Sequence, residues 1–413
     1  MRILLVSEDI PYPNMGGLAK HVLTLARALV HAGHQADLLG SDQHPIAVAG
    51  TEGKFGGQFF GELNGHFAGF KEIPLGVFVP FKRPWIARRF ARIIMRHARH
   101  YDVIHYHGHV PDVALHIPAD INFVQTRHDQ GSDCLIHTRF RDGAICTASD
   151  PAACAGCKTL HPNALQRAVS AAAVRRFRSD VAAGFSRHKT LFVSGLLQRN
   201  LARTLGPPPW GATAHNFIDI SAIEHARRTA GAMTERTRRP DALFVFVAGK
   251  LYPAKGVRPF LQALQPHLRP HMHVTVAGDG EDEQQLRAEF ESRQVQFLGW
   301  RSGADTLQIA AAASAIVVPS IWEEPCATTI LEGLLLGKPT FALDRGGTPE
   351  LAMYAAAPGQ LRLHADMQAL VHDLVSFQPR KDADSVPGGL GGAERAVEKL
   401  LAIYRLPPGP LLD

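Results

Sequence analysis

Two glutamates eight positions apart, Glu324 and Glu332, lie at a predicted junction between a strand and a helix. We expect the strand to end at Pro319 and the helix to begin near Cys326. At about 100° per residue, eight residues bring both carboxylates to a similar face, so that one contacts sugar hydroxyls and the other a ribose. The free N–H groups at the start of this helix would meet a phosphate. They belong to Ala327, Thr328 and Thr329.

Two lysines follow another predicted strand, 243–248. Lys250 and Lys255 lie in the segment that directly follows it. Such a pair can clamp a diphosphate by charge alone, although lysines in exposed loops are often only solvated. Glycines mark further turns at which backbone N–H groups can approach an anion. These glycines are Gly16, Gly17, Gly249 and Gly278.

Four of the five cysteines are clustered with the spacing C-x₁₁-C-x₇-C-x₂-C. They are Cys134, Cys146, Cys154 and Cys157. Four thiolates could bind Zn²⁺ tetrahedrally and pin a loop that lacks a core of its own. The alternatives are two disulfides or unligated thiols. In a chain expected to be cytosolic, clustered cysteines favour metal over disulfides, so we expect a structural zinc.

The elements that must position these groups alternate between strands and helices, which predicts two doubly wound α/β domains with parallel sheets. Ligands of such sheets bind at the carboxyl ends of the strands, where the lysines and glutamates stand. In the first half, strands are predicted at 3–7, 36–39, 103–106, 121–126 and 190–193. In the second half, they are predicted at 243–248, 274–277, 295–298, 316–319 and 340–343.

Proline- and glycine-rich segments predict the domain boundaries. A stiff Gly-Pro-Pro-Pro stretch stands at 206–209, and a glycine-rich linker at 387–392 precedes a last helical pattern. Residues 44–81 are expected to form an irregular insertion. The predicted parts are 1–205, 206–388 and 389–413, the last returning to the N-terminal domain.

Composition excludes several classes of protein. Of the 413 residues, 46% are hydrophobic and 20% charged, as in an ordinary globular protein. No apolar run approaches the roughly 20 residues that span a bilayer. The first strand is too short for a signal peptide, so we expect a cytoplasmic protein. A G-x-G-x-x-G fingerprint is absent, which disfavours an NAD(P)-dependent oxidoreductase. One Asp-x-Asp motif, at 382–384, falls in a polar linker.

Charge is distributed unevenly. Residues 1–205 hold 24 Lys/Arg against 15 Asp/Glu, a balance of +9, whereas the remainder holds 20 against 23, a balance of −3. The segment 83–100 contains six arginines and no acidic residue. Its apolar and basic residues fall on different helical faces, which fits a helix on an anionic membrane surface. An ordinary amphipathic helix packed on a core fits equally well.

Several short motifs recur in order along the chain. In the second half they are G-K-L…K-G (249–256), G-D-G (278–280), F-L-G-W (297–300), P-S…E-P-x₆-E (319–332) and G-G-x-P-E (346–350). The first half adds Gly16-Gly17, His128-Asp129, Ser194 and Asn216. Taken together, these motifs resemble family GT4, retaining glycosyltransferases that include sucrose-phosphate synthase and bacterial polysaccharide glycosyltransferases. The resemblance covers most of the chain outside 44–81 and implies the GT-B fold, two Rossmann-like domains facing across a cleft.

The resemblance implies a role for each matched residue. Glu324 would hold hydroxyls of the donor sugar and Glu332 the ribose, while His128 would contact the sugar from the opposite domain. Lys250 and Lys255 would neutralise the departing diphosphate. The expected catalytic residues are thus His128, Lys250, Lys255 and Glu324. The expected donor-binding residues are Gly16, Gly17, Gly249, Gly278, Leu298, Cys326, Ala327, Thr328, Thr329 and Glu332.

Two departures from the family pattern affect this site. Lys250 stands where many members have arginine, which keeps the charge but loses bidentate geometry. Cys326-Ala327 replaces the common Phe-Gly and changes the expected shape of the sugar pocket.

We therefore expect sugar transfer, with retention, from a UDP-, GDP- or ADP-sugar to a glycan or lipid-linked acceptor, in cell-surface polysaccharide biosynthesis. No catalytic metal and no nucleic acid partner are expected, and the segment 83–100 would touch the inner membrane face. The alternatives are a GT-B nucleotide-sugar epimerase, for which no extra acid/base pair is visible, and an inactive sugar-nucleotide-binding protein. A glycosidase fits poorly because the two glutamates adjoin a phosphate site.

Overall fold

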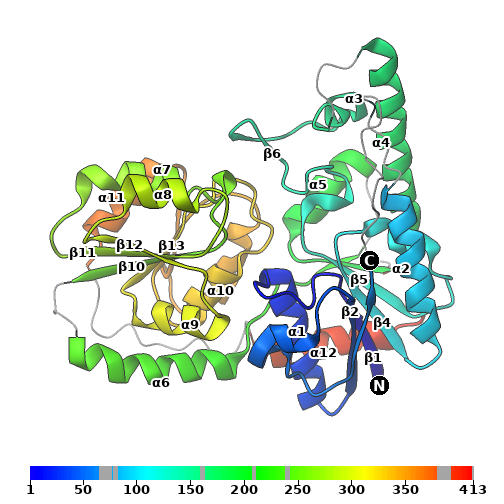
Figure 1. The fold of residues 1–413 in the computed structure, drawn as a ribbon, viewed down its shortest axis with the longest axis horizontal. Coiled ribbons are helices and arrows are strands. Elements are labelled where there is room, and N and C mark those ends of the chain that lie inside the picture. Colours follow the sequence, from blue (N-terminus) through cyan, green and yellow to red (C-terminus); the bar gives the residue numbers. More distant parts are fainter. Residues whose placement is uncertain are drawn as a thin grey trace. The chain divides into compact units, whose positions relative to one another are not determined.

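The structure, a computed structural model, describes residues 1–64, 77, 82–158, 163–206, 211–237, 242–378 and 392–411. The chain divides into two compact units (Figure 1). Unit 1 consists of Met1–Arg139, Cys146–Asn216 and Ala396–Asp413, and unit 2 consists of Phe140–Ile145 and Phe217–Arg395. Each unit is built around a parallel sheet, which confirms the predicted α/β class.

Unit 1 contains a sheet with the strand order β3-β2-β1-β4-β5-β8-β9 in the described residues. Its central strands are buried almost throughout, as expected where helices cover a parallel sheet. The strands are β1 (Arg2–Val6), β2 (Gln35–Ser41), β3 (Phe59–Leu63), β4 (Val103–His107), β5 (Phe123–Arg127), β8 (Lys189–Phe192) and β9 (Ala212–Thr213). Strand β3 lies in the segment predicted to be irregular, and it pairs with β2 at the edge of the sheet.

Helices cover this sheet. The helix α2 (Lys82–Ala98) buries Phe90 and Ile94 in a core that includes Leu4 and Ile104 of the sheet. The last helix returns to the sheet, since the Tyr404 hydroxyl lies 2.6 Å from Nδ1 of His105. The helices are α1 (Gly17–His31), α2, α3 (Pro151–Ala155), α4 (Ala164–Phe185), α5 (Gly195–Leu205) and α12 (Ala393–Arg405). Short 3₁₀ helices are η1 (Ile46–Gly53), η3 (Pro111–His116) and η4 (Gln130–Ser132).

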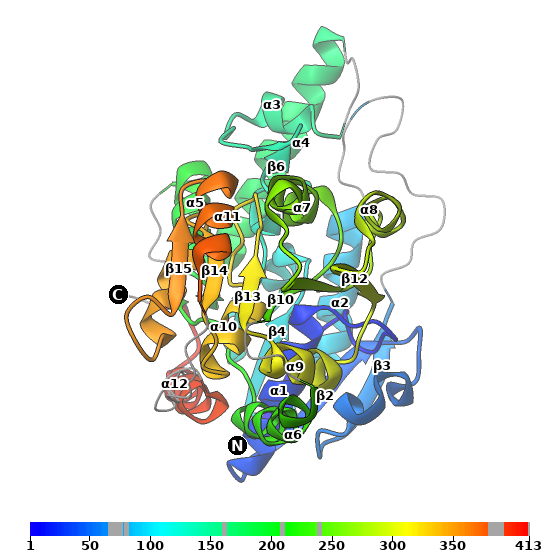
Figure 2. The same ribbon diagram turned by 90° about the vertical axis from the view of Figure 1, so that its left-hand side faces the viewer.

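Unit 2 contains a parallel sheet with the order β12-β11-β10-β13-β14-β15, and Figure 2 shows β15, β14, β13 and β10 side by side in this sequence. The strand order reverses between β10 and β13, which makes this the switch point at which doubly wound sheets bind ligands. The strands are β10 (Leu243–Ala248), β11 (Met272–Ala277), β12 (Val295–Gly299), β13 (Ala315–Val318), β14 (Thr340–Leu343) and β15 (Leu361–His364).

The sheet of unit 2 lies between two layers of helices. In Figure 1, α7 (Val257–Leu264), α8 (Glu283–Phe290) and α11 (Met367–Ser376) cover one face. On the other face lie α6 (Ile220–Thr237), α9 (Gly303–Ala312) and α10 (Thr328–Leu335). Short 3₁₀ helices are η5 (Pro253–Lys255), η6 (Gln265–His267) and η7 (Thr348–Tyr354). The core joins Val245 and Val274 of the sheet to Phe260 and Leu374 of the first layer.

Several predicted features lie outside the described residues. They are the prolines at 207–209, the Asp-x-Asp motif at 382–384 and the glycine-rich linker up to residue 391. Within the described ranges, no helix combines the length and the apolar character needed to cross a membrane.

Candidate active site

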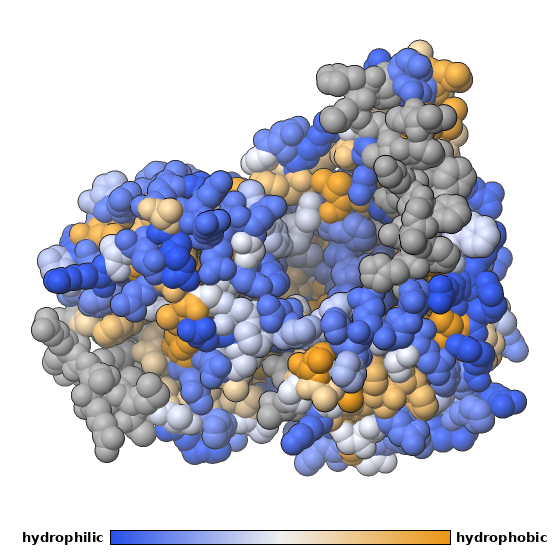
Figure 3. Space-filling view, in the orientation of Figure 1, coloured by the Kyte–Doolittle hydropathy of each residue, from blue (hydrophilic) through white to orange (hydrophobic). Residues whose placement is uncertain are grey.

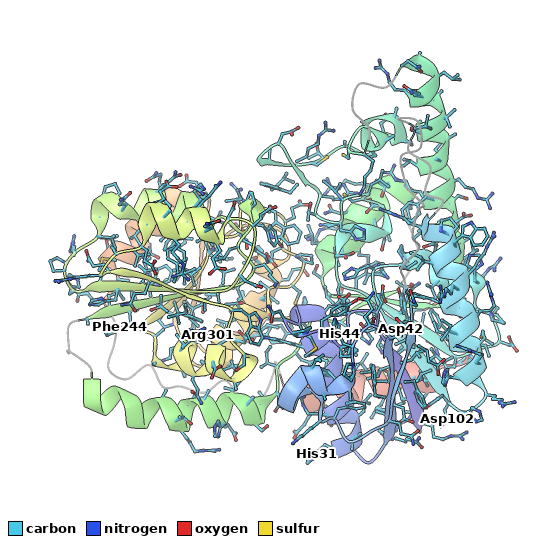
Figure 4. All side chains as sticks on the ribbon, in the orientation of Figure 1. His31, Asp42, His44, Asp102, Phe244 and Arg301 are labelled. Carbon is cyan, nitrogen blue, oxygen red and sulfur yellow. The ribbon has the colours of Figure 1, made fainter. Side chains whose placement is uncertain are left out.

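The switch point of unit 2 brings two loops together at the carboxyl edge of the sheet. One follows β10 and carries Lys250 and Lys255, and the other follows β13 and carries Glu324. Figure 4 marks this edge by Arg301, just beyond β12, and the opposite edge by Phe244 near the start of β10. The chain therefore delivers both groups to the edge at which a ligand is expected.

Lys255 and Glu324 are paired. The Lys255 Nζ lies 2.7 Å from Oε1 and 2.9 Å from Oε2 of Glu324. Glu324 also accepts a hydrogen bond from the Ser320 hydroxyl at 2.9 Å and one from the Trp322 indole N–H at 2.6 Å. Because four donor contacts converge on one carboxylate, they fix the position of Glu324.

Electrostatics keep Lys255 charged. Burial alone would lower its pKa, but the Glu324 carboxylate outweighs this effect and the pKa is raised above the usual value. The Nζ also lies 5.3 Å from the centre of the Trp322 ring and 5.8 Å from that of Tyr252. The site therefore holds a permanent cation whose position is set by its neighbours.

Lys250 is more exposed, and its Nζ lies 2.7 Å from Oδ1 of Asp279. Beside it, Gly278 has φ 149°, and a Cβ there would come within 1.8 Å of the Gly249 carbonyl oxygen. The Gly278 N–H donates to the carbonyl of Gly299, which follows Leu298 at the end of β12. Glycine thus allows the loops after β10, β11 and β12 to pack closely at this edge.

The helix α10 begins later than predicted. Its N-cap is Ala327 and its first residue Thr328, so Glu324 and Cys326 precede the helix. The helical repeat used to align Glu324 with Glu332 does not extend to Glu324, because the loop before the helix places this residue. Glu332 lies in the second turn, half-buried, while Cys326 and Ala327 are buried at the start. By position, the N–H groups of Thr328 and Thr329 lack intrahelical acceptors and suit an anion.

The remaining predicted residues lie in unit 1, at the carboxyl edge of its sheet. Figure 4 marks this edge by Asp42 and His44, and the opposite edge by Asp102. Gly16 is the N-cap of α1 and Gly17 its first residue, and both are exposed. The first turn of α1 is therefore accessible to an anion, as the sequence predicts.

His128 follows β5 in a cluster of imidazoles. Its Nε2 lies 3.0 Å from Nδ1 of His107, and its ring centre lies 5.1 Å from that of His21. Burial lowers the pKa of His128 well below the usual value, and the nearby charges of His21 and Arg127 act in the same direction. His128 is therefore a neutral imidazole, suited to hydrogen bonding rather than to charge stabilisation.

Sequence reasoning passed over several polar residues at this edge. His109 lies 2.6 Å from a carboxylate oxygen of Asp129 and 2.8 Å from one of Asp9. Its backbone N–H donates to Glu8, whose pKa is raised chiefly by burial. The sequence feature that could have revealed them is the histidine at every second position, 105, 107 and 109, because this pattern continues past the carboxyl end of a strand.

The four clustered cysteines are not assembled into a tetrahedral site. All four are described and none forms a disulfide. Among the described residues, the groups of three or more metal-ligating atoms within 4.8 Å of one another contain no cysteine. The sulfur of Cys154 instead accepts a hydrogen bond from Arg178 at 3.1 Å. The structure therefore does not bring the predicted four-thiolate set together.

Comparison with known proteins decides the family. The profile of Glycosyltransferase Family 4 matches residues 15–222, and that of Glycosyl transferases group 1 matches residues 242–376. The chain belongs to glycosyltransferase family 4. The predicted enzyme class is thereby confirmed, and the two matches account for most of the chain.

One curated protein and two solved structures resemble this glycosyltransferase along almost its whole length. It is 28% identical to glycogen synthase of Mycobacterium tuberculosis strain H37Rv, over 93% of this chain and 89% of the relative. Sucrose-phosphate synthase of Thermosynechococcus elongatus is 16% identical, with a TM-score of 0.65 and 98% of each chain covered. The Anabaena protein HepE, solved with UDP-glucose, is 18% identical, with a TM-score of 0.56 and 98% of each chain covered. These structural likenesses confirm the GT-B fold.

Proposed function

We propose that this glycosyltransferase moves a sugar from a nucleoside diphosphate sugar to a glycan or lipid-linked acceptor, with retention of configuration. The observation that best supports the proposal is the pairing of Lys255 with Glu324, which stands three residues before the N-cap of α10. A fixed cation, a carboxylate suited to sugar hydroxyls and the N–H groups at the start of a helix thus belong to one site. The solved complex of HepE with UDP-glucose supports a nucleotide-sugar donor, with UDP, GDP and ADP as candidate carriers.

The proposed reaction breaks the bond between C1 of the sugar and the diphosphate oxygen. A bond from C1 to the acceptor oxygen forms on the same face, and the acceptor proton passes to the departing diphosphate. Negative charge grows on the diphosphate, where Lys250, Lys255 and the N–H groups of α10 stabilise it without a catalytic metal. Glu324 orients the sugar, Glu332 binds the ribose, and neutral His128 contacts the sugar.

A donor screen with UDP-, GDP- and ADP-sugars tests this proposal. The donor should raise the melting temperature, because saturation to 100 times Kd stabilises the chain by about 2.7 kcal/mol. Release of the nucleoside diphosphate should require the same donor and should persist in EDTA, once elemental analysis shows that any structural metal is retained. A reversible requirement for Mg²⁺ or Mn²⁺, or the absence of any donor-dependent shift, would contradict the proposal.

The acceptor is proposed to bind unit 1 near an anionic surface, as in assembly of a cell-surface polysaccharide at the inner membrane face. In α2 the exposed positions form a stripe that includes Trp85, Arg88 and Arg92. Apolar side chains also gather near the N-terminal end of α4 (Figure 3), where Leu165 is 74% exposed. Basic and apolar groups together suit an anionic lipid more than a soluble acidic acceptor.

Liposome sedimentation is expected to show binding that rises with anionic lipid content and falls with salt. Neutralising Arg88 and Arg92 should weaken it about 30-fold, at about 1 kcal/mol for each basic residue near the lipid. Arg96 is a poorer choice because it pairs with Glu62. Neutralising the exposed Arg269 and Arg293 of unit 2 is the matched control. Equal effects of the two double variants, or no binding at low salt, would remove the support for a lipid-linked acceptor.

A further inference from the structure

Three loops of unit 1 meet at the carboxyl edge of its sheet. The strand order reverses between β1 and β4, so the loops after these strands are neighbours, and β5 pairs with β4 on its other side. Asp9 follows β1, His109 follows β4 and Asp129 follows β5. His137 comes from the segment after Asp129. These residues form a polar group to which the proposed sugar transfer assigns no role.

Three of these side chains point at a common centre. Nδ1 of His109 and Nδ1 of His137 lie 2.6 and 3.2 Å from the same oxygen, Oδ2 of Asp129. All three candidate ligand atoms lie within 4.8 Å of one another. Tetrahedral Zn²⁺ with bonds of about 2.0–2.1 Å needs ligand atoms about 3.3 Å apart, and both separations from Asp129 Oδ2 lie within about 1 Å of this value. The side chains are 39%, 32% and 17% exposed in the order His109, His137 and Asp129, so an ion can reach them.

The surroundings orient two of these side chains as a metal requires. Nε2 of His109, the nitrogen facing away from the centre, lies 2.8 Å from Oδ2 of Asp9. The second oxygen of Asp129, Oδ1, accepts the Gly131 N–H at 2.7 Å. A histidine that binds a metal almost always donates its other N–H to a carboxylate or carbonyl, and bound carboxylates are themselves hydrogen-bonded.

The backbone is also shaped to admit His137. A Cβ at residue 131 would lie 2.2 Å from Nδ1 of His137, so glycine there leaves the space that the ring occupies. His137 itself has φ 64°, in the left-handed region that a non-glycine residue adopts only at a cost. The glycine at position 131 and the left-handed backbone of His137 thus both serve to place the His137 imidazole beside Asp129.

We propose that His109, Asp129 and His137 bind one divalent transition-metal ion, with Zn²⁺ the best match, and leave a fourth position for water. Two imidazoles and one carboxylate suit Zn²⁺ better than Ca²⁺ or Mg²⁺, which prefer oxygen. The ion replaces the proton between His109 and Asp129, and that proton leaves to solvent. The bound ion ties the loop after β4 to the loop after β5.

A second cluster, His21, His107 and His128, also brings three candidate ligand atoms within 4.8 Å of one another. It offers no carboxylate to balance a dication, and His107 and His128 already share a hydrogen bond. Burial of an uncompensated double charge is unfavourable, so the group containing Asp129 is the better site.

The proposal is tested by zinc content. Full-length protein without an affinity tag is dialysed against Zn²⁺, then against metal-free buffer, and measured by elemental analysis. His137→Gly should hold about one zinc per chain fewer than wild type, and glycine suits the left-handed backbone there. Asp9→Asn should weaken Zn²⁺ binding by about 10- to 100-fold. His44→Gln, at the same sheet edge, and Cys154→Ser/Cys157→Ser should leave this zinc in place.

Cobalt identifies the ligands independently of any activity. Co²⁺-loaded wild type should show visible d–d bands without the thiolate charge-transfer absorption of a cysteine site, and His137→Gly should lose those bands. The proposal is overturned if His137→Gly retains all zinc, if the zinc is lost with the cysteines instead, or if wild type binds none. Gly131→Ala places a methyl group in the space of the His137 ring and should therefore lose the zinc and the d–d bands as well. Agreement between the two variants shows that the loss is not peculiar to His137→Gly.

Discussion

Lys255→Ala is expected to lower donor turnover by on the order of 100-fold or more, the usual effect of removing one group that stabilises transition-state charge. The Nζ of Lys255 is a half-buried cation at the switch point of unit 2, and Glu324 holds it charged. Without it, charge on the departing diphosphate would meet only Lys250 and the N–H groups of α10. Single-turnover release of the nucleoside diphosphate measures this loss directly, and kcat should fall more than KM rises.

Two controls separate catalysis from folding. Arg258→Ala removes a neighbouring cation that pairs with Glu289 on the surface, so turnover should stay near the wild-type rate. Melting curves of Lys255→Ala report the cost of leaving the Glu324 carboxylate without its cation. A normal turnover per folded molecule in Lys255→Ala would refute the assignment of this residue, however far the melting temperature falls.

The inner strands of the unit 2 sheet were predictable because a strand that is buried on both faces consists of a continuous run of apolar residues. The predicted runs 243–248 and 340–343 coincide with β10 and β14. Two edge strands carry no such run. Strand β15 is half-buried throughout, and β3, at the edge of the other sheet, is mostly half-buried or exposed, so neither is distinguishable from a loop by pattern alone.

The candidate site was predictable to the extent that topology fixes it. Parallel strands end at one edge, so Lys255 and Glu324 had to be near each other once both were placed after strands. Their direct pairing depends on the path of the loop from Ser320 to Ala327, which no periodicity records. The group formed by His109, Asp129 and His137 was missed for a related reason, since two separate loops contribute it.

The contacts that hold the cysteine segment also come from separate parts of the chain and could not be predicted. The sequence predicted that thiolates would hold this loop, but buried polar side chains hold it in the structure. Asp133 pairs with Arg139 and accepts a hydrogen bond from the Thr204 hydroxyl. Arg178 donates to the Asp133 carbonyl oxygen at 3.2 Å and to the sulfur of Cys154. One carboxylate and two guanidinium groups thus anchor the segment that follows His128.

Asp133→Ala is therefore expected to destabilise unit 1 by about 3–5 kcal/mol, the usual cost of removing one partner of a buried ion pair. The side chains of Asp133 and Arg139 are 2% and 4% exposed, so the orphaned guanidinium cannot regain water without opening the loop. Burial raises the pKa of Asp133 even beside Arg139, so the pair itself adds little stability. The expected loss of stability in Asp133→Ala arises because the Arg139 guanidinium is left buried without its carboxylate. Differential scanning calorimetry of the full chain should show the unit 1 transition moving to lower temperature.

The control is an exposed ion pair in the same unit. Arg176 is 79% exposed and pairs with Asp180 one helical turn away, so Arg176→Ala should change stability by about 0.5 kcal/mol or less. The unit 2 transition should move with neither variant, since Arg139, Arg178 and Thr204, the partners of Asp133 named above, lie within unit 1. If Asp133→Ala melts like Arg176→Ala, the buried network does not hold this segment. If both transitions shift together, the damage is not confined to the loop that follows His128.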